Sequence, residues 1–296
     1  MGLRSALSSR VGRRTWTLGL TCLALVAFAG NSLIGRQALR HTPIDPANYT
    51  LVRLASGAAV LALIVAWQHR RDAQPTRTWR EGHWISGAAL FAYAVMFSYA
   101  YGAMTAATGT LLLFPTVQIT MIGWGWHLGE RLTRFQTAGL LLAAAGLLAL
   151  LWPGLSAPPW LDAMLMMGAG AAWGVYSLRG RGALDPTAVT AGNFWRAAVL
   201  ALVVSVLTWP GWHWDAQGVA WAMLSGGVTS GCGYALWYLA LRGLKATTAS
   251  VVQLGVPVLV LLGGAWWLGE PVTVFITVCA AAVIGGIAMV LKPSRA

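Results

Sequence analysis

The sequence predicts an all-α integral membrane protein in which ten transmembrane helices form two inverted five-helix repeats. Three observations lead to this fold class: the composition, a series of long apolar stretches, and an internal repeat. Of the 296 residues, 57% are hydrophobic and only 9% are charged, and the mean hydropathy is +0.65. Soluble globular domains carry far more charge, so the hydrocarbon core of a bilayer is the expected main environment of the chain.

Apolar stretches of about 18 residues or more, the length that crosses about 30 Å of hydrocarbon, recur along the whole chain. They cover residues 16–35, 48–67, 84–104, 108–128, 135–152, 160–178, 188–208, 217–241, 246–268 and 272–291. Because they lack the period-two alternation of barrel strands, helices are expected. The connections between them are too short to hold a soluble domain.

The basic residues predict the membrane topology. The net charge is +12, but the basic residues are scattered in small groups between the spans, so nucleic acid is not an expected partner. If the N-terminus is cytoplasmic, sixteen of the twenty Lys and Arg residues fall on the cytoplasmic side. Both termini are therefore expected in the cytoplasm, with residues 1–15 and 292–296 as short cytoplasmic segments.

Metal and proton chemistry have no evident carriers. The three cysteines, Cys22, Cys232 and Cys279, lie in apolar stretches without a CxxC motif or a histidine cluster, so neither a metal site nor a cofactor is expected. All eight acidic residues lie in connections or at span ends, which leaves no mid-membrane carboxylate for a proton relay.

The chain repeats itself at an offset of 140 residues. WHLGERLT, ending at Thr133, recurs as WWLGEPVT, ending at Thr273. The same offset pairs Asp45-Pro46 with Asp185-Pro186, and small gaps pair Arg53 with Arg196. The two repeats are expected at 16–152 and 160–291. Because each holds five spans, an odd number, they enter the membrane in opposite orientations, an arrangement that suits alternating access.

The repeated turns are expected to be structural. Gly129 and Gly269 can end the preceding helices in the left-handed conformation, and Glu130 and Glu270 precede helix starts, where a carboxylate is favoured. Thr133 with Gln136 three residues later has the spacing of a capping box.

Polar groups inside the spans are candidates for a substrate site. Proline and glutamine interrupt the fourth and ninth spans, at Pro115 and Gln118 and at Gln253 and Pro257, and paired interruptions in equivalent helices indicate a transport site. Gln118 and Gln253 are therefore candidate hydrogen-bonding groups for the substrate. The alternative is that both mark packing kinks with interhelical amide bonds.

Aromatic side chains recur on single helix faces and form a second set of candidates. The set comprises Tyr93, Tyr101, Trp173, Tyr176, Tyr234 and Tyr238. Such stripes either line a cavity or pack helices. Asn31 has the same two interpretations. Arg53 and Arg196 lie near span starts, which favours structural roles such as helix capping or snorkelling, with binding of a substrate carboxylate as the alternative.

These motifs resemble those of an EamA-type member of the drug/metabolite transporter (DMT) superfamily over residues 15–291. The resemblance is carried by Gly30-Asn31-Ser32, Arg53, the two Leu-Gly-Glu turns and the ten spans in two halves. It implies a multi-pass protein of the bacterial inner membrane in which the third helix of each half and the sixth helix of the chain line a cavity. One departure is the segment Phe28-Ala29-Gly30-Asn31, which lacks a tryptophan that many members carry in the first span.

The expected function is secondary transport by alternating access. The resemblance implies small metabolites such as amino acids as the cargo and export as the direction. The expected partners are a small-molecule substrate and the lipid bilayer, and the oligomeric state is left open, a homodimer included. Efflux of drugs or cationic compounds is the alternative cargo. A membrane-embedded enzyme and a channel are less favoured, because the sequence shows neither a catalytic cluster nor a selectivity-filter motif.

Overall fold

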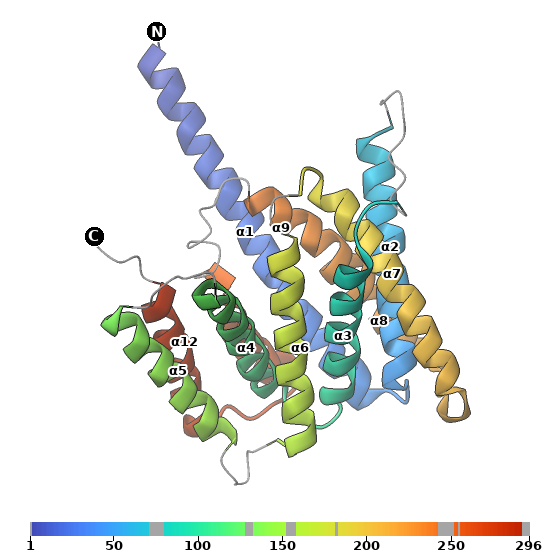
Figure 1. Cartoon of the computed structure of the whole chain (residues 1–296). Helices are drawn as coiled ribbons and strands as arrows, with labels where there is room; N and C mark the ends of the chain where they lie inside the picture. Colours follow the sequence, from blue (N-terminus) through green and yellow to red (C-terminus); the bar gives the residue numbers. More distant parts are fainter. Residues whose placement is uncertain are drawn as a thin grey trace.

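The computed structural model describes residues 2–70, 80–127, 133–151, 158–180, 183–241, 252–253 and 255–291. Over these residues the chain consists of helices joined by short connections, and it contains no strand (Figure 1). The prediction of an all-α fold is confirmed for this part of the chain.

The first half contains five helices near the five predicted spans. They are α1 (Gly2–His41), α2 (Pro46–Gln68), α3 (Trp84–Ala100), α4 (Ala106–His127) and α5 (Arg134–Leu151). The largest difference is α1, which has 40 residues where the sequence predicted a span at 16–35. Since the first proline of the chain is Pro43, no residue interrupts this helix.

The second half contains the helices α6 (Trp160–Arg179), α7 (Pro186–Leu207), η1 (Trp209–Gly211), α8 (Ala216–Leu224), η2 (Ser225–Cys232), α9 (Gly233–Leu241), α11 (Gly255–Trp267) and α12 (Val274–Leu291). Three of them, α8, η2 and α9, form one continuous run in place of the predicted span 217–241. The middle segment η2 is π-helical over SGGVTSGC. Wide π-helical turns of this kind often occur at functional sites. The predicted span 246–268 lies partly outside the described residues.

Helix starts follow the sequence motifs. Asp45 caps α2 by accepting hydrogen bonds from the amides of Ala47 and Asn48, and Asp185 caps α7 by accepting one from Ala188. Proline follows each aspartate at the first helical position, where its missing N–H costs nothing. At α5, the Thr133 amide donates to Gln136 Oε1 and the Gln136 amide donates to Thr133 Oγ1, the two hydrogen bonds of a capping box.

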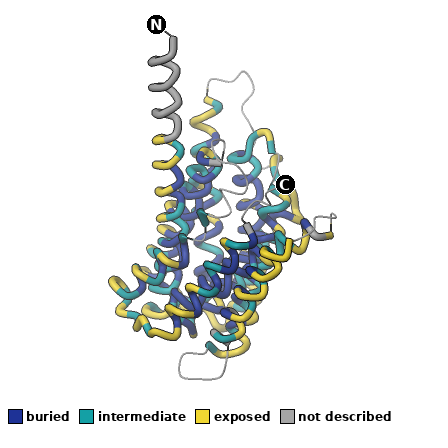
Figure 2. The backbone as a smooth tube through the Cα atoms, turned by 90° about the vertical axis from the view of Figure 1, so that its left-hand side faces the viewer, coloured by how far each residue is buried: buried dark blue, intermediate teal, exposed yellow. Residues whose placement is uncertain are grey.

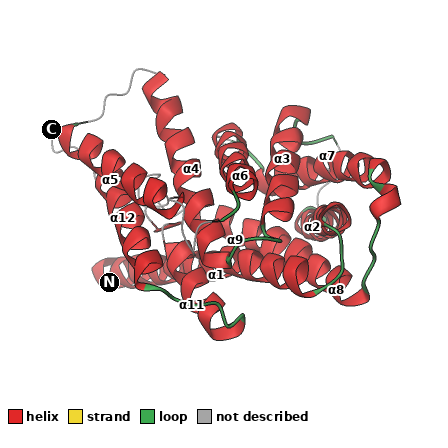
Figure 3. Cartoon of the chain, turned by 90° about the horizontal axis from the view of Figure 1, so that it is seen from below, coloured by secondary structure: helices red, strands yellow, loops and turns green. Residues whose placement is uncertain are grey.

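Small residues bring the helices into close contact. Helices α5 and α12 pack together on one side of the bundle, and α2 and α7 pack together on the opposite side, as Figures 1 and 3 both show. A Cβ atom placed on Gly139 would lie 2.5 Å from the carbonyl oxygen of Gly286, and one on Gly170 would lie 2.5 Å from that of Leu113. The α5–α12 and α4–α6 pairs therefore depend on glycine, as helix pairs in membranes often do.

The outer surface of the bundle is apolar. Large side chains such as Leu18, Leu63, Leu141, Leu202 and Leu262 are exposed, and the exposed positions follow the outer faces of the helices (Figure 2). Within the described residues, four segments are long and apolar enough to cross a membrane: Thr15–His41, Pro46–Gln68, Ala106–Gly125 and Pro186–Leu207. Three shorter helices, α3, α11 and most of α12, are similarly apolar. An apolar surface of this extent is favourable in contact with lipid and unfavourable in contact with water.

Candidate functional site

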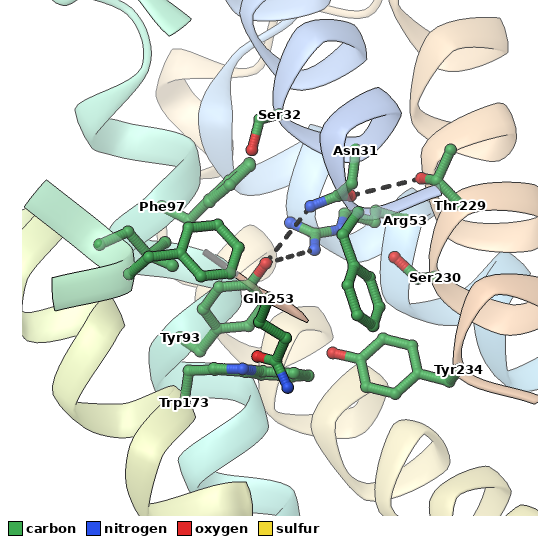
Figure 4. Close-up of a pocket in the computed structure, with 13 residues that line it drawn as sticks. Asn31, Ser32, Arg53, Tyr93, Phe97, Trp173, Thr229, Ser230, Tyr234 and Gln253 are labelled. Carbon is green, nitrogen blue, oxygen red and sulfur yellow. Dashed lines mark hydrogen bonds between the residues drawn. The ribbon is translucent and has the colours of Figure 1, made fainter. Parts of the chain in front are cut away.

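A pocket lies within the bundle, with walls from both halves of the chain. Its empty volume is about 450 Å³, open solvent at its mouth included. The lining residues are Phe28, Asn31, Ser32, Arg53, Tyr93, Phe97, Leu113, Phe114, Trp173, Thr229, Ser230, Tyr234 and Gln253 (Figure 4). They come from α1, α2, α3, α4, α6, η2 and α9, together with the residue pair that precedes α11.

One wall is a network of hydrogen bonds around the Tyr93 hydroxyl. That oxygen accepts from Asn31 Nδ2 at 3.3 Å and from Arg53 Nη2 at 3.2 Å. The other amide atom of Asn31, Oδ1, accepts a hydrogen bond from Ser225 Oγ at 2.8 Å. The network therefore joins α1, α2, α3 and η2. Because each amide atom of Asn31 has a partner, the asparagine is held in one orientation at the pocket wall.

Among the described residues that line the pocket, Arg53 is the charged one. Its side chain is buried, with a relative exposure of 2%, and the guanidinium carbon lies 4.8 Å from the centroid of Phe97 and 5.3 Å from that of Tyr93. Both rings stabilise the cation through their electron-rich faces. Nε and Nη1 of Arg53 have no hydrogen-bond partner among the described residues, and no aspartate or glutamate lines the pocket. The pocket is therefore electropositive at this wall.

The opposite wall is aromatic. The Trp173 ring centroid lies 5.0 Å from that of Tyr93 and 5.1 Å from that of Tyr234. Figure 4 shows the Tyr234 hydroxyl and the Gln253 amide directed into the space beside Trp173. This wall thus presents aromatic faces with two neutral polar groups, a combination that can hold an apolar group bearing a hydrogen-bonding function.

The π-helical segment places its hydroxyl groups at the pocket because glycine allows it to contact α2 directly. A Cβ atom on Gly226 would lie 2.0 Å from the carbonyl oxygen of Arg53. This contact between the backbones of η2 and α2 brings Ser225 to Asn31 and places Thr229 and Ser230 in the lining.

Five of the nine predicted cavity candidates line this pocket: Asn31, Tyr93, Trp173, Tyr234 and Gln253. Four others do not belong to its lining: Gln118, Tyr101, Tyr176 and Tyr238. Gln118, Tyr101 and Tyr176 are buried in the helix packing around the pocket, and Tyr238 is half-buried against the core. Tyr101 packs edge-on against Phe97 at 4.5 Å, and Tyr176 lies 5.4 Å from Trp173, so both support lining residues from behind.

The two repeat-related arginines have different surroundings. Arg196 donates from Nη1 to the backbone carbonyls of Glu81 and Gly192 and lies over the ring of Trp84. It therefore ties α7 to the connection before α3. Arg53 instead lines the pocket. The sequence had favoured a structural role for this arginine.

Sequence reasoning did not select Ser32, Thr229 and Ser230 as site residues. A usable signal was present for the last two, because SGGVTSGCG at 225–233 combines hydroxyls with four glycines inside an apolar stretch. Ser32 follows Asn31 in the motif Gly30-Asn31-Ser32 but was not singled out from it.

A second polar cluster lies beside the pocket, at the turn between α11 and α12. Glu270 Oε1 lies 3.1 Å from Arg36 Nε, and both Glu270 carboxylate oxygens accept from the Ala106 amide at the start of α4. Arg36 Nη1 also donates to the carbonyls of Tyr101 and Gly102. We call Arg36, Glu270 and the Ala106 amide the Glu270 clasp.

Gly269 shapes this turn. Its φ of 63° is left-handed, and the Glu270 amide then bonds back to the carbonyl of Gly264. Gly129 and Glu130, the repeat-related residues, lie outside the described residues. Among those that are described, no group of three or more His, Cys, Asp or Glu side chains could hold a metal ion.

Comparison with known proteins gives concordant results. A model of the EamA-like transporter family matches residues 15–152 and again residues 160–292. "Uncharacterized protein PA1977" of Pseudomonas aeruginosa is 50% identical over 277 residues, which is 94% of this chain and 95% of the relative. "Uncharacterized transporter YoaV" of Bacillus subtilis is 25% identical over 258 residues, 83% of this chain and 87% of the relative.

A solved crystal structure shares the fold. It superposes on this chain with a TM-score of 0.67 at 22% sequence identity. The superposition covers 93% of this chain and 97% of the chain in the crystal structure.

Proposed function

The chain belongs to the EamA-like transporter family and is a membrane transporter, and on that premise we propose that it is a secondary carrier working by alternating access. Its cargo is a small metabolite, with amino acids as the leading class and export as the direction. The observation that carries the proposal is the pocket itself, which takes its walls from both halves of the chain and lies beside the Glu270 clasp.

The helix contacts support an arrangement of two inverted five-helix repeats, residues 16–152 and 160–291. The offset of 140 residues pairs α1 with α6, α2 with α7, α3 with the α8–η2–α9 run, α4 with α11, and α5 with α12. If each helix is replaced by its repeat partner, the contact between α3 and α6 becomes the contact of α1 with α8 and α9. The contact between α4 and α6 becomes that between α11 and α1, and all these contacts are present. The pairs α2–α7, α4–α11 and α5–α12 exchange into themselves. A pseudo-two-fold axis gives this pattern.

The Glu270 clasp provides a closure for one side of the pocket. Arg36 lies one helical turn beyond Ser32, which lines the pocket, so the clasp occupies the path from the pocket to that end of the bundle. It joins α1, the α3–α4 connection and the α11–α12 turn. Breaking and remaking it would let the two halves open and close on this side, as alternating access requires.

The charge of the pocket favours metabolites over cationic drugs. Acidic groups would stabilise a cation, and none is found among the described residues that line the pocket, whereas Arg53 repels a cation. Amino acids offer a carboxylate and an apolar side chain that match the polar and aromatic walls.

The bacterial inner membrane is the proposed location, with both termini cytoplasmic. The distribution of Lys and Arg supports this topology, and the two relatives described above are bacterial proteins. With this orientation the Glu270 clasp faces the outside of the cell.

Counterflow in proteoliposomes tests the carrier proposal. Vesicles containing the purified protein and preloaded with unlabelled phenylalanine or leucine should take up the labelled amino acid transiently and saturably. Protein-free vesicles are the control, and ethidium is the cationic comparison. Saturable movement of ethidium with no counterflow of either amino acid would select the alternative cargo, and a flux that never saturates would indicate a channel.

A further inference from the structure

We infer that the pocket recognises a monovalent carboxylate through Arg53, with the substrate's apolar group held by the aromatic wall. The inference rests on the proposed carrier function and names the chemical class of its substrate. It starts from a side chain that is buried and charged but only partly satisfied by its surroundings.

Two donor atoms of Arg53, a residue of the pocket wall, are buried without a hydrogen-bond partner among the described residues. Nη2 uses one hydrogen on the Tyr93 hydroxyl, while Nε and Nη1 have no partner among the described residues. A guanidinium carries five N–H donors in a planar fork, which matches the two oxygens of a carboxylate. A buried donor without a partner is costly, so a bound acceptor would be favoured at this position.

The charge of Arg53 also has no acidic partner in the part of the chain that the structure describes. The described lining of the pocket contains no acidic side chain, and the rings of Tyr93 and Phe97 compensate the cation only in part. One negative charge would neutralise the site. A dianion such as a phosphate monoester would leave a net negative charge in a pocket lined largely by aromatic and apolar side chains, which is unfavourable. The observations therefore favour a monoanion.

The contrast with Arg196 strengthens the assignment. Arg196 stands at the related position of the other half and donates to two backbone carbonyls. Among the described residues, Arg53 donates to the Tyr93 hydroxyl and to no backbone carbonyl. Two arginines of shared origin thus have different tasks, one holding backbone and the other facing the pocket.

The remaining walls define the rest of the substrate. Trp173, Tyr93 and Tyr234 form a cluster of rings. The Trp173 centroid lies 5.0 Å from that of Tyr93 and 5.1 Å from that of Tyr234. Phe28 adds an edge contact to Tyr234 at 6.0 Å. These faces suit an aromatic or branched apolar group. An ammonium group would find only neutral acceptors such as Gln253, so it is not required for recognition.

Matched ligands test the inference on the unaltered protein. Binding to the purified full-length protein is measured by its melting temperature in detergent at pH 7.5, with 3-phenylpropionate, phenylalanine, 3-phenylpropanamide, phenylalaninamide and phenyl phosphate. Both carboxylates should raise the melting temperature in a saturable manner, since only ligands of the folded state do so. Each amide should bind at least about tenfold more weakly than its acid, because it lacks the charge-assisted hydrogen bonds.

Variants locate the effect. Arg53→Gln should remove the preference for acid over amide, and Arg53→Lys should keep part of it, since lysine retains the charge without the fork. Arg40→Gln is the matched control, because it removes the same charge at an exposed position of α1. Size-exclusion profiles check that the variants remain folded.

Three results would overturn the inference: amides that bind the wild-type protein as well as acids, phenyl phosphate that binds more tightly than 3-phenylpropionate, or no binding by either carboxylate. None of them would by itself remove the carrier proposal, which fails if counterflow is absent for every cargo or if the flux never saturates. The two failures are therefore distinguishable.

Discussion

Glu270 and Arg36 are 234 residues apart in the sequence and form an ion pair of 3.1 Å beside the central pocket. Both side chains are largely buried, and the same carboxylate caps α4 through the Ala106 amide. A partly buried ion pair with several hydrogen bonds contributes more than an exposed pair, since solvent screens it less. The Arg36–Glu270 ion pair is therefore suited to hold one side of the pocket closed and to break again during transport.

Removing the carboxylate should open this side of the pocket. In a variant without Cys22, Cys232 and Cys279, Ser32→Cys reports on access to the pocket through its reaction with a membrane-impermeant thiol reagent. Glu270→Ala should raise the labelling rate from outside the cell by about tenfold, because it removes charge-assisted hydrogen bonds worth about 1.5 kcal/mol or more. His41→Ala, an exposed change on the same helix, should leave the rate unchanged. Equal labelling with and without Glu270 would show that the clasp does not close the pocket.

Gly226 should tolerate no side chain. A Cβ atom there would lie 2.0 Å from the Arg53 carbonyl oxygen and 2.1 Å from Ser56 Oγ, so Gly226→Ala must push η2 away from α2. The expected loss is about 1–3 kcal/mol of unfolding free energy, the usual cost of overpacking, measured as a lower melting temperature in detergent. Gly123→Ala is the control, because nothing lies within 4 Å of its Cβ position, and alanine favours a helix interior. A melting temperature for Gly226→Ala equal to that of wild type would contradict the close contact.

An added acid should compete with the substrate for Arg53. Asn31 and Arg53 both donate to the Tyr93 hydroxyl, so the carboxylate of Asn31→Asp would lie near the guanidinium. The ligand-free protein should melt at a higher temperature, and 3-phenylpropionate should bind at least about tenfold more weakly, since the site would already be neutral. Asn31→Ser, which adds no charge, is the matched comparison. Unchanged affinity in Asn31→Asp would separate Arg53 from the carboxylate site.

Most of the helical fold could be predicted from the sequence, because in a membrane it depends on local properties. Apolar length locates the helices, and Asp45-Pro46, Asp185-Pro186 and Thr133 mark their starts in the structure. These signals act over a few residues. The full length of α1 was missed because polar residues can continue a helix beyond the apolar core.

The pocket could be predicted only in part, because membership in its lining depends on helix rotation and depth. Tyr93 and Tyr101 share a face of α3, yet only Tyr93 lines the pocket, while Tyr101 packs near the helix end. The structural role favoured for Arg53 rested on its distance from the span start. That distance does not reveal that Gly226 brings η2 against α2 and that α3 supplies two rings and a hydroxyl around the charge.

Trp173 should contribute directly to cargo binding, because its ring joins Tyr93 and Tyr234 across the aromatic wall. Trp173→Ala removes the shared face and should raise the half-saturation concentration for counterflow of phenylalanine by about tenfold or more, as expected for loss of a buried aromatic contact. Trp173→Phe should retain part of the affinity. Trp195→Ala is the matched control, since Trp195 is 49% exposed on the outer face of α7 and faces lipid in the proposed arrangement. The amount of inserted protein should be equal in all three. If Trp195→Ala lowered the affinity as much as Trp173→Ala, the effect would come from general loss of tryptophan packing, and the pocket would not be the site of binding.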